Sequence, residues 1–293
     1  MHREQRVTVV EVGGALRAYR IGEREVLDGY GPHELCTAAR GQSLIPWPNR
    51  LEDGLYTFDG QEHQLALSEP AKHNAIHGLV RWSNWSVAER EDHRVVMVHR
   101  LHPQPGYPFA LDLSITYSLS AAGLRVTTTA TNVGPGPCPY GAGAHPYLTV
   151  GTDRLDDASV TVPASTWLPA DGRGIPLGEQ PVDGTPYDFR AARPIAATQL
   201  DTGYTDLVRD EDGLARVRLS SGAEGAAVAL WLDESHPYLM VFTGDSLPEP
   251  QRRRRGLGVE PMTCAPNALS SGAGLKILEP GSSFTGSWGI EPW

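Results

Sequence analysis

Short stretches in which apolar or β-branched residues alternate with polar ones recur along the chain, and turn residues separate them. Clear examples lie at residues 7–12, 111–117, 124–130, 227–232 and 238–242. Alternation with a period of two places successive side chains on opposite faces of a strand. We therefore predict a β-strand at each of these stretches.

Turn-forming residues and the lack of helical periodicity extend this prediction to the whole chain. The 32 glycines and 24 prolines are spread evenly. Asp59-Gly60 is typical of a tight hairpin turn, because both residues tolerate positive φ angles. No stretch of a dozen residues shows a helical period, and residues 169–198 are expected to form a long surface loop. Many short, regularly spaced strands predict an all-β sandwich or barrel, which we expect to be a single domain over residues 1–293.

Composition and charge narrow the class of protein. Of the 293 residues, 40% are hydrophobic and 20% charged, as in ordinary globular proteins, and the net charge of −10 argues against a nucleic-acid partner. Three distant cysteines, with no CxxC pair, indicate reduced thiols rather than a disulfide framework or a zinc ribbon. Residues 1–20 have no signal-peptide core and no apolar run reaches a membrane span. We expect a cytoplasmic protein, a monomer or homodimer, that does not bind membranes.

Four short motifs contain the candidate chemistry. They are Asn49-Arg50, His77-Gly78, His145-Pro146-Tyr147 and Val259-Glu260-Pro261. A histidine exchanges protons near neutral pH, and partial burial of a glutamate raises its pKa towards the working range. If these segments converge, two imidazoles and one carboxylate would form an acid–base site suited to a polyhydroxylated substrate.

Each motif also has a purely structural interpretation. His145 and His77 suit hydrogen-bonding roles at a strand end and in a loop, Glu260 suits a surface carboxylate, and Arg50 suits a surface salt bridge. His73 and His77 have metal-ligand spacing for a helix, but no glutamate follows His73 and Gly78 would end a helix, so a turn is favoured.

Two other features have alternative interpretations. The run Arg252–Arg255 is either a solvated loop, which we favour, or a clamp for a sugar phosphate. Trp47, Trp82 and Trp85 suit core packing, the commoner role, or stacking on a sugar.

The order of the motifs resembles the aldose 1-epimerase (galactose mutarotase) family from about Ile45 to Pro292. The resemblance rests on Pro-Asn-Arg-Leu at 48–51, the Gly54 to Gly60 hairpin, His-Gly at 77–78 with Trp85 downstream, His-Pro-Tyr-Leu at 145–148, Leu-Asp-x-x-Tyr at 200–204, Phe-Thr-Gly at 242–244 and Val-Glu-Pro at 259–261.

The resemblance implies a large, twisted antiparallel β-sandwich that interconverts the α and β anomers of a free aldohexose without cofactor or metal. Glu260 matches the family's general base and His145 its general acid. The matched sugar-binding residues are His77, Arg50 and Asp201, with Asn49 and Tyr147 adjoining them and Asp206 as a rival to Asp201.

Two departures from the family pattern leave the identity of the sugar open. Leu79 replaces a second glycine after His77-Gly78, and Met240 stands where well-studied members have a sugar-binding glutamine.

Three alternative functions remain: a hexose-phosphate 1-epimerase, supported by Arg252–Arg255 alone; a non-catalytic carbohydrate-binding protein; and a metal enzyme using His77, His145 and Glu260.

Overall fold

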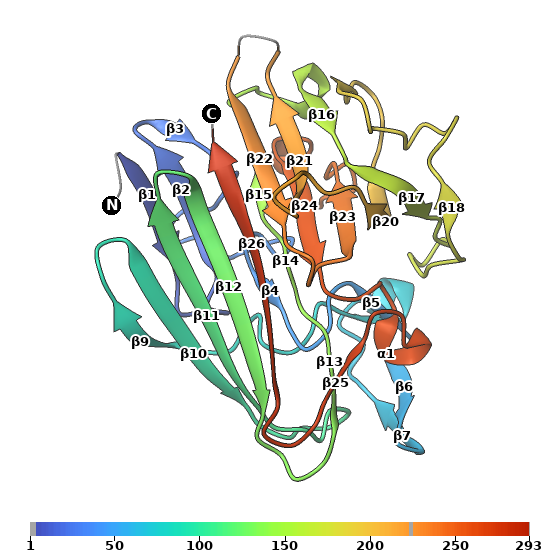
Figure 1. Ribbon diagram of the computed structural model, residues 1–293. Helices are drawn as coiled ribbons and strands as arrows, with labels where there is room; N and C mark the ends of the chain where they lie inside the picture. The colour runs from blue at the N-terminus through green and yellow to red at the C-terminus, as the bar shows by residue number, and fades with distance from the viewer. Residues whose placement is uncertain (1–3, 223–224, 293) are drawn as a thin grey trace.

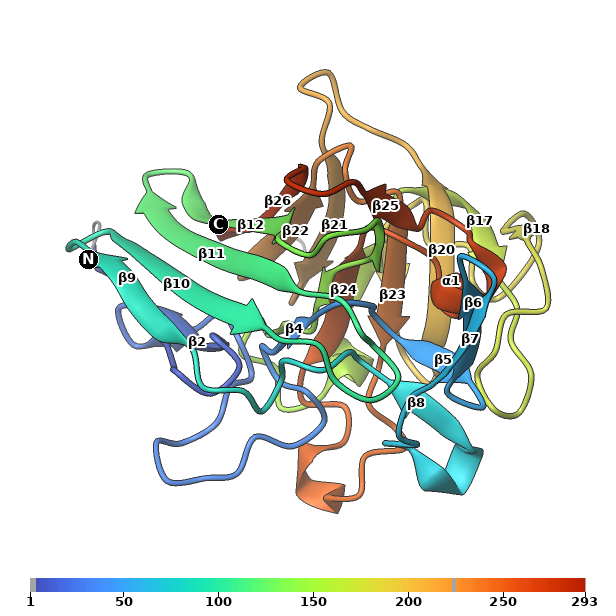
Figure 2. The ribbon, with the colours of Figure 1, turned by 90° about the horizontal axis from the view of Figure 1, so that it is seen from below.

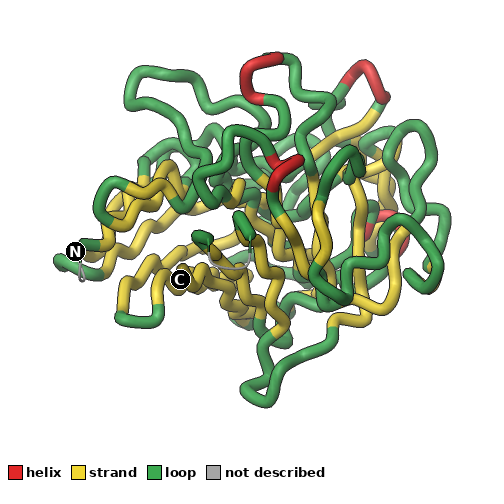
Figure 3. Tube along the Cα trace, turned by 90° about the horizontal axis from the view of Figure 1, so that it is seen from above, coloured by secondary structure: helices red, strands yellow, loops and turns green. Residues whose placement is uncertain are grey.

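A computed structural model describes residues 4–222 and 225–292, and nearly all of the regular structure in these residues is β-strand (Figure 1, Figure 3). The largest sheet has nine antiparallel strands. Their order is β19 (Arg193–Pro194), β16 (Ser159–Thr161), β21 (Ala215–Ser220), β22 (Ala227–Leu232), β26 (Ser283–Pro292), β12 (Gly123–Asn132), β11 (Leu111–Ser120), β10 (Arg94–Leu101) and β9 (Ser86–Arg90).

The second large sheet carries the strands that build the site. Its order is β18 (Gln180–Pro181), β17 (Ala164–Leu168), β20 (Asp201–Leu207), β23 (Tyr238–Phe242), β24 (Leu257–Met262), β14 (Gly143–Ala144) and β4 (Ser43–Leu44), and β15 (Tyr147–Leu148) also pairs with β24. All six residues of β24 are buried, so this strand is covered on both faces.

Smaller sheets and short helices complete the described residues. The strands are β1 (Gln5–Val9), β2 (Leu16–Ile21) and β3 (Arg24–Glu25); β5 (Arg50–Glu52) with β8 (Asn74–Ile76); β6 (Leu55–Phe58) with β7 (Gln61–Gln64); and β13 (Cys138–Tyr140) with β25 (Lys276–Leu278). The helices are α1 (Ala268–Ser271) and the 3-10 turns η1 (Pro70–Lys72), η2 (Leu155–Asp157) and η3 (Pro250–Arg252). Within the described ranges no helix has the length and apolar character needed to cross a bilayer.

The two large sheets form layers around a shared apolar core (Figure 2). On β11, buried residues alternate with partly exposed ones, so one face of the strand packs inward. Leu113 and Ile115 on that face belong to the same cluster of buried side chains as Val241 and Val259 of the second sheet. The prediction of an all-β sandwich is therefore confirmed.

The local predictions also hold in most places. Four predicted strands match β11, β12, β22 and β23, whereas the strand predicted at 7–12 ends at Val9, where the pairing with β2 shifts register. Asp59 and Gly60 have φ angles of 47° and 72°, which confirms the hairpin turn. Residues 169–198 contain only the two-residue strands β18 and β19, and the three cysteines are free and buried.

Candidate active site

The central feature of the site is the contact between His145 and Glu260. Gly143 pairs with Met262, and Tyr147 pairs with Gly258, so the same antiparallel register places His145 opposite Glu260 in β24. His145 Nε2 lies 3.2 Å from Glu260 Oε1, and the two side chains are 6% and 3% exposed. Glu260 Oε2 is buried without a hydrogen-bond partner among the described residues, so it is a vacant acceptor.

Burial controls the protonation of this pair. Loss of hydration lowers the pKa of His145 to about 3, and neighbouring arginines, including Arg40 and Arg81, act in the same direction. Loss of hydration also raises the pKa of Glu260 well above its ordinary value, and the charge of Asp201 adds to this effect. Burial therefore favours an uncharged pair that holds one proton between the two groups.

His77 is fixed by the segment that precedes Arg50. The backbone N–H of Asn49 donates to His77 Nδ1 at 3.2 Å, and the backbone N–H of His77 donates to the carbonyl of Asn49 at 2.9 Å. Burial holds the pKa of His77 well below its usual value, with His145 and Arg81 contributing. Because Nδ1 accepts a hydrogen bond in this neutral ring, the proton lies on Nε2, and His77 is a hydrogen-bond donor at Nε2.

Arg50 begins β5 and lies between two carboxylates. Its Nε and Nη2 donate to the two oxygens of Glu69 at 2.8 and 3.1 Å, and its Nη1 lies 3.7 Å from Asp201 Oδ2. Asp201 begins β20, and its side chain is 45% exposed. This arrangement provides a fixed cation beside an accessible carboxylate, which suits recognition of sugar hydroxyls.

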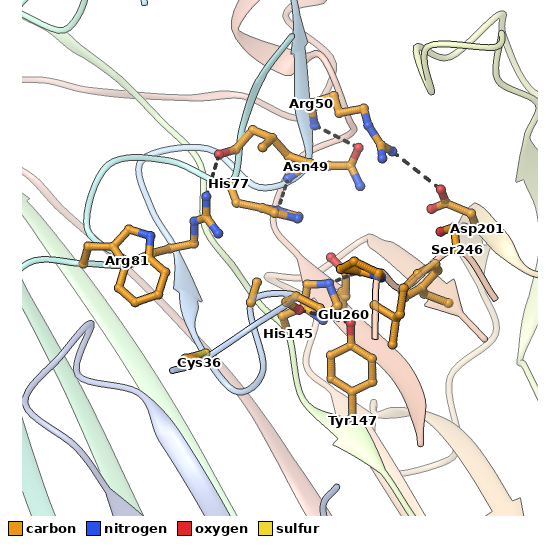
Figure 4. A pocket seen from close by; sticks show the side chains of 17 residues that line it. Cys36, Asn49, Arg50, His77, Arg81, His145, Tyr147, Asp201, Ser246 and Glu260 are labelled. Carbon is orange, nitrogen blue, oxygen red and sulfur yellow. Dashed lines mark hydrogen bonds and ion pairs between the residues drawn. The ribbon is translucent and has the colours of Figure 1, made fainter. Parts of the chain in front are cut away.

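These side chains line one pocket of about 290 Å³, close to the lower end of the usual range for small-molecule sites (Figure 4). All seven residues predicted for the site lie in its wall: Asn49, Arg50, His77, His145, Tyr147, Asp201 and Glu260. The ring of Tyr147 stacks on His145 with the centroids 4.9 Å apart, and its hydroxyl donates to the carbonyl of Ala38. Trp82 also lines the pocket and is 54% exposed.

The structure separates these residues from the alternatives that the sequence left open. Asp206 accepts a hydrogen bond from Thr166 and does not line the pocket, so Asp201 is the one of these two aspartates that reaches the pocket. Met240 pairs with Glu260 in the neighbouring strand but is likewise absent from the wall. His73 has a left-handed backbone after η1 and contacts Asp53, but the three residues that follow it form the strand β8. The segment from His73 to His77 is therefore not a helix, and the turn predicted for it is limited to His73.

The arginine run and two of the tryptophans have structural roles. Arg252 contacts Asp28 and Glu34, and Arg254 contacts Asp156 and Asp245. Arg253 donates to the carbonyl of Leu247, Arg255 lies 3.6 Å from Asp28, and none of the four lines the pocket. Trp47 and Trp85 are core residues, 2% and 0% exposed.

The sequence did not indicate several residues in or beside the pocket, and three of them bear on its chemistry. Glu69 holds Arg50, Phe242 packs edge-on against His145, and Arg81 lines the pocket. Phe242 belongs to the Phe-Thr-Gly motif, which was a usable signal for its position. Glu69 and Arg81 lie outside the matched motifs, and their roles depend on contacts that no local pattern indicates.

The donor geometry also bears on metal binding. One ligand atom from each of His77, His145 and Glu260 lies within 4.8 Å of the others. However, a metal on Nε2 of His77 would move the ring proton to Nδ1, where it would face the N–H of Asn49. The hydrogen bonding of His77 therefore suits a hydrogen-bond donor to the substrate better than a metal ligand.

The comparisons with known proteins agree with this geometry. The sequence profile of the aldose 1-epimerase family matches residues 2–291. The chain is 34% identical over 275 residues to the uncharacterized protein YihR of Escherichia coli, which covers 94% of this chain and 86% of that protein. It is 27% identical over 252 residues to the aldose 1-epimerase of E. coli, covering 81% and 72% of the two chains.

Solved structures show the same fold. A GalM/aldose epimerase homologue from Caenorhabditis elegans superposes with a TM-score of 0.89 at 18% identity, over 100% of this chain and 97% of the other. A putative aldose 1-epimerase from E. coli gives 0.86 at 21% identity, with the same coverage. The fold, the matched profile and the arrangement of the pocket together show that this chain belongs to the aldose 1-epimerase family.

Proposed function

We propose that the protein is an aldose 1-epimerase that interconverts the α and β anomers of an aldohexose by opening and closing the ring. The observation that carries this proposal is the His145–Glu260 contact of 3.2 Å at a pocket of about 290 Å³. The reaction needs one group that removes a proton from the anomeric hydroxyl and another that protonates the ring oxygen. The hydroxyl oxygen and the ring oxygen are both bonded to the anomeric carbon. An acid and a base that lie next to each other can therefore reach both oxygens.

The residues of the pocket support a balanced proton transfer. Glu260 takes the proton of the anomeric hydroxyl on its vacant Oε2, while His145 gives a proton to the ring oxygen and the C1–O5 bond breaks. The resulting aldehyde turns about the C1–C2 bond. His145 then takes back the hydroxyl proton, Glu260 returns its proton to the aldehyde oxygen, and the ring closes on the other face.

The uncharged pair is the form that accompanies the open sugar. To start the reaction, the shared proton moves from Glu260 to His145 across their 3.2 Å contact, so that the reacting pair is carboxylate and imidazolium. After ring opening the pair is again carboxylic acid and neutral imidazole. Burial lowers the pKa of His145 and raises that of Glu260, so the dry pocket favours the second form. The charged pair is therefore the transient form, and the pair returns to its uncharged form as the proton passes to the ring oxygen and the ring opens.

Substitution of the pair tests the proposal. Glu260→Gln and His145→Asn should each lower anomer exchange, measured by NMR exchange spectroscopy, by about 10²- to 10⁴-fold, the usual worth of a positioned proton-transfer group. Glu279→Gln, at an exposed glutamate outside the pocket, is the matched control. Retained exchange in Glu260→Gln would remove Glu260 from the mechanism. Tight sugar binding by the unmodified protein, with exchange no faster than in buffer, would instead support a non-catalytic carbohydrate-binding protein.

A further inference from the structure

Arg81 is a cation of the pocket that the proposed reaction does not use. It follows the His77-Gly78 motif, and its side chain is half-buried in the pocket wall. The chain around it is held in place: the carbonyl of Arg81 accepts from Gln42 at 2.9 Å, and the carbonyl of Ser83 accepts from Gly13 at 2.8 Å. The guanidinium therefore extends from a fixed stretch of backbone.

Within residues 4–222 and 225–292, the structure shows no carboxylate in ion-pair contact with Arg81. Its Nη2 makes a long hydrogen bond of 3.5 Å to the carbonyl of Ile76, and its Nε is buried without a partner. Two neighbouring arginines differ, because Arg50 pairs with Glu69 and Arg40 pairs with Asp28. Partial burial of a cation without hydrogen-bond partners costs free energy, and binding of an anion would offset this cost.

The position of Arg81 indicates which part of the sugar it would meet. In Figure 4, Arg81 and Asp201 lie on opposite sides of the His145–Glu260 pair. Arg81 donates to the carbonyl of Ile76, which precedes His77, and the ring centroid of His77 lies 5.4 Å from that of His145. Asp201 lies instead beside Arg50, 3.7 Å from its Nη1. Around a pyranose ring, the anomeric carbon is flanked by C2 on one side and by the ring oxygen, C5 and C6 on the other. With His145 at the ring oxygen, Asp201 therefore lies towards C2 and Arg81 towards C6.

From this arrangement we infer that the substrate is an aldohexose with an anionic group at C6, bound by Arg81 in a charge-assisted contact. This inference rests on the proposed function, because the assignment of C6 depends on His145 facing the ring oxygen. Phosphate, sulfonate and carboxylate share the required chemistry, since each presents negatively charged oxygens to a guanidinium. The sequence suggested a charged sugar only through Arg252–Arg255, and these arginines lie outside the pocket. Arg81 is a cation in the pocket that can bind an anionic group.

The test is a binding measurement that does not depend on catalysis. The probes are 1,5-anhydroglucitol, which has no anomeric hydroxyl, and its 6-phosphate, 6-sulfonate and 6-carboxylate analogues. Calorimetry at low salt should give at least one charged analogue about 10- to 100-fold tighter binding than the neutral parent, the range for hydrogen bonds to charged groups. The preference should shrink as salt is added. The analogue that binds most tightly identifies the anion.

Variants at Arg81 assign the preference to this residue. Arg81→Met should reduce the ratio of charged to neutral affinity to about 1, and Arg81→Lys should retain part of it. Arg255→Met, at an exposed arginine outside the pocket, should leave the ratio unchanged. Equal or weaker binding of all three charged analogues by the unmodified protein would overturn the inference, and so would a preference that persists in Arg81→Met.

The two proposals can fail separately. If the protein exchanges the anomers of neutral aldoses and shows no charge preference in binding, the anionic substrate is wrong and the epimerase activity stands. If Arg81 confers a charge preference but no neutral or charged aldose is exchanged faster than in buffer, the anion site stands and the epimerase activity is wrong.

Discussion

Arg50 is held by Glu69 through two parallel hydrogen bonds of 2.8 and 3.1 Å, so its guanidinium has a fixed plane in the pocket wall. The remaining nitrogen, Nη1, lies 3.7 Å from Asp201. Asn74 donates to the same oxygen of Glu69 that Arg50 Nε contacts. Glu69 is therefore a positioning residue for the sugar-binding side of the site.

Replacing Glu69 with glutamine should weaken sugar binding more than it slows the chemistry. One charge-assisted hydrogen bond is lost, which corresponds to about a tenfold rise in KM. The fall in kcat should stay below about threefold, because Glu69 does not contact the reacting pair. Glu62→Gln, at an exposed glutamate of β7, is the control. A large fall in kcat with constant KM would show that Glu69 acts on the chemistry instead.

The shifted pKa values predict an unusual pH dependence. Between the lowered pKa of His145, about 3, and the raised pKa of Glu260, the pair holds one proton. As the pH falls, activity is lost only when a second proton binds to the pair, near the lowered pKa of His145. As the pH rises, activity is lost only when the shared proton leaves, near the raised pKa of Glu260. After correction for exchange in buffer, kcat/KM should change by less than about twofold between pH 4.5 and 6. A tenfold change there would mean that one group titrates near its ordinary pKa.

Chelation should leave the activity intact. His77 accepts the N–H of Asn49 at Nδ1, so its Nε2 carries a proton and is not a metal ligand in this hydrogen-bonding state. Prolonged treatment with EDTA, followed by NMR exchange spectroscopy, should give an unchanged rate. Loss of activity that added Zn²⁺ restores would contradict the assignment and favour a site made of His77, His145 and Glu260.

Gly78 should be far less tolerant of alanine than a glycine at an open turn. Its φ is 70°, and an added Cβ would lie 2.0 Å from the carbonyl oxygen of Ile45, which accepts a hydrogen bond from Leu79. Gly60 has a similar φ of 72° but nothing within 4 Å of its Cβ position. In urea unfolding, Gly60→Ala should cost about 1–2 kcal/mol and Gly78→Ala more than about 3 kcal/mol. Equal losses would show that the backbone at Gly78 shifts without cost.

Two tryptophans three residues apart should respond differently to alanine. Trp82 is 54% exposed in the pocket wall, where its ring can cover an apolar face of the sugar. Trp82→Ala should raise KM about 3- to 10-fold with little change in Tm. Trp85 is fully buried, so Trp85→Ala should lower the unfolding free energy by about 3–5 kcal/mol. Unchanged KM in Trp82→Ala would exclude it from the sugar site.

The β-structure was predictable because it follows from local patterns. On β11, the alternation of apolar and polar residues coincides with the observed alternation of burial, and the φ angles of Asp59 and Gly60 are those that an Asp-Gly hairpin requires. The strand predicted at 7–12 ended early because a register shift next to Val9 and the turn at Gly13-Gly14 interrupt the pairing. Val12 instead forms a bridge with Asn84, and Gly13 donates to the carbonyl of Ser83, so contacts with a distant segment helped to set that boundary.

The strand-rich architecture and the residue types available for acid–base chemistry follow from the sequence, because side-chain alternation is visible in short stretches and the motifs follow a recognisable order along the chain. Three features required the folded chain: His145 faces Glu260, Asp201 rather than Asp206 reaches the pocket, and Arg81 lines the pocket whereas Arg252–Arg255 make their contacts outside it. Strand register joins residues more than a hundred positions apart, and the exclusion of water then sets their charge. Neither the strand register nor the burial of these side chains can be read from a short stretch of the chain.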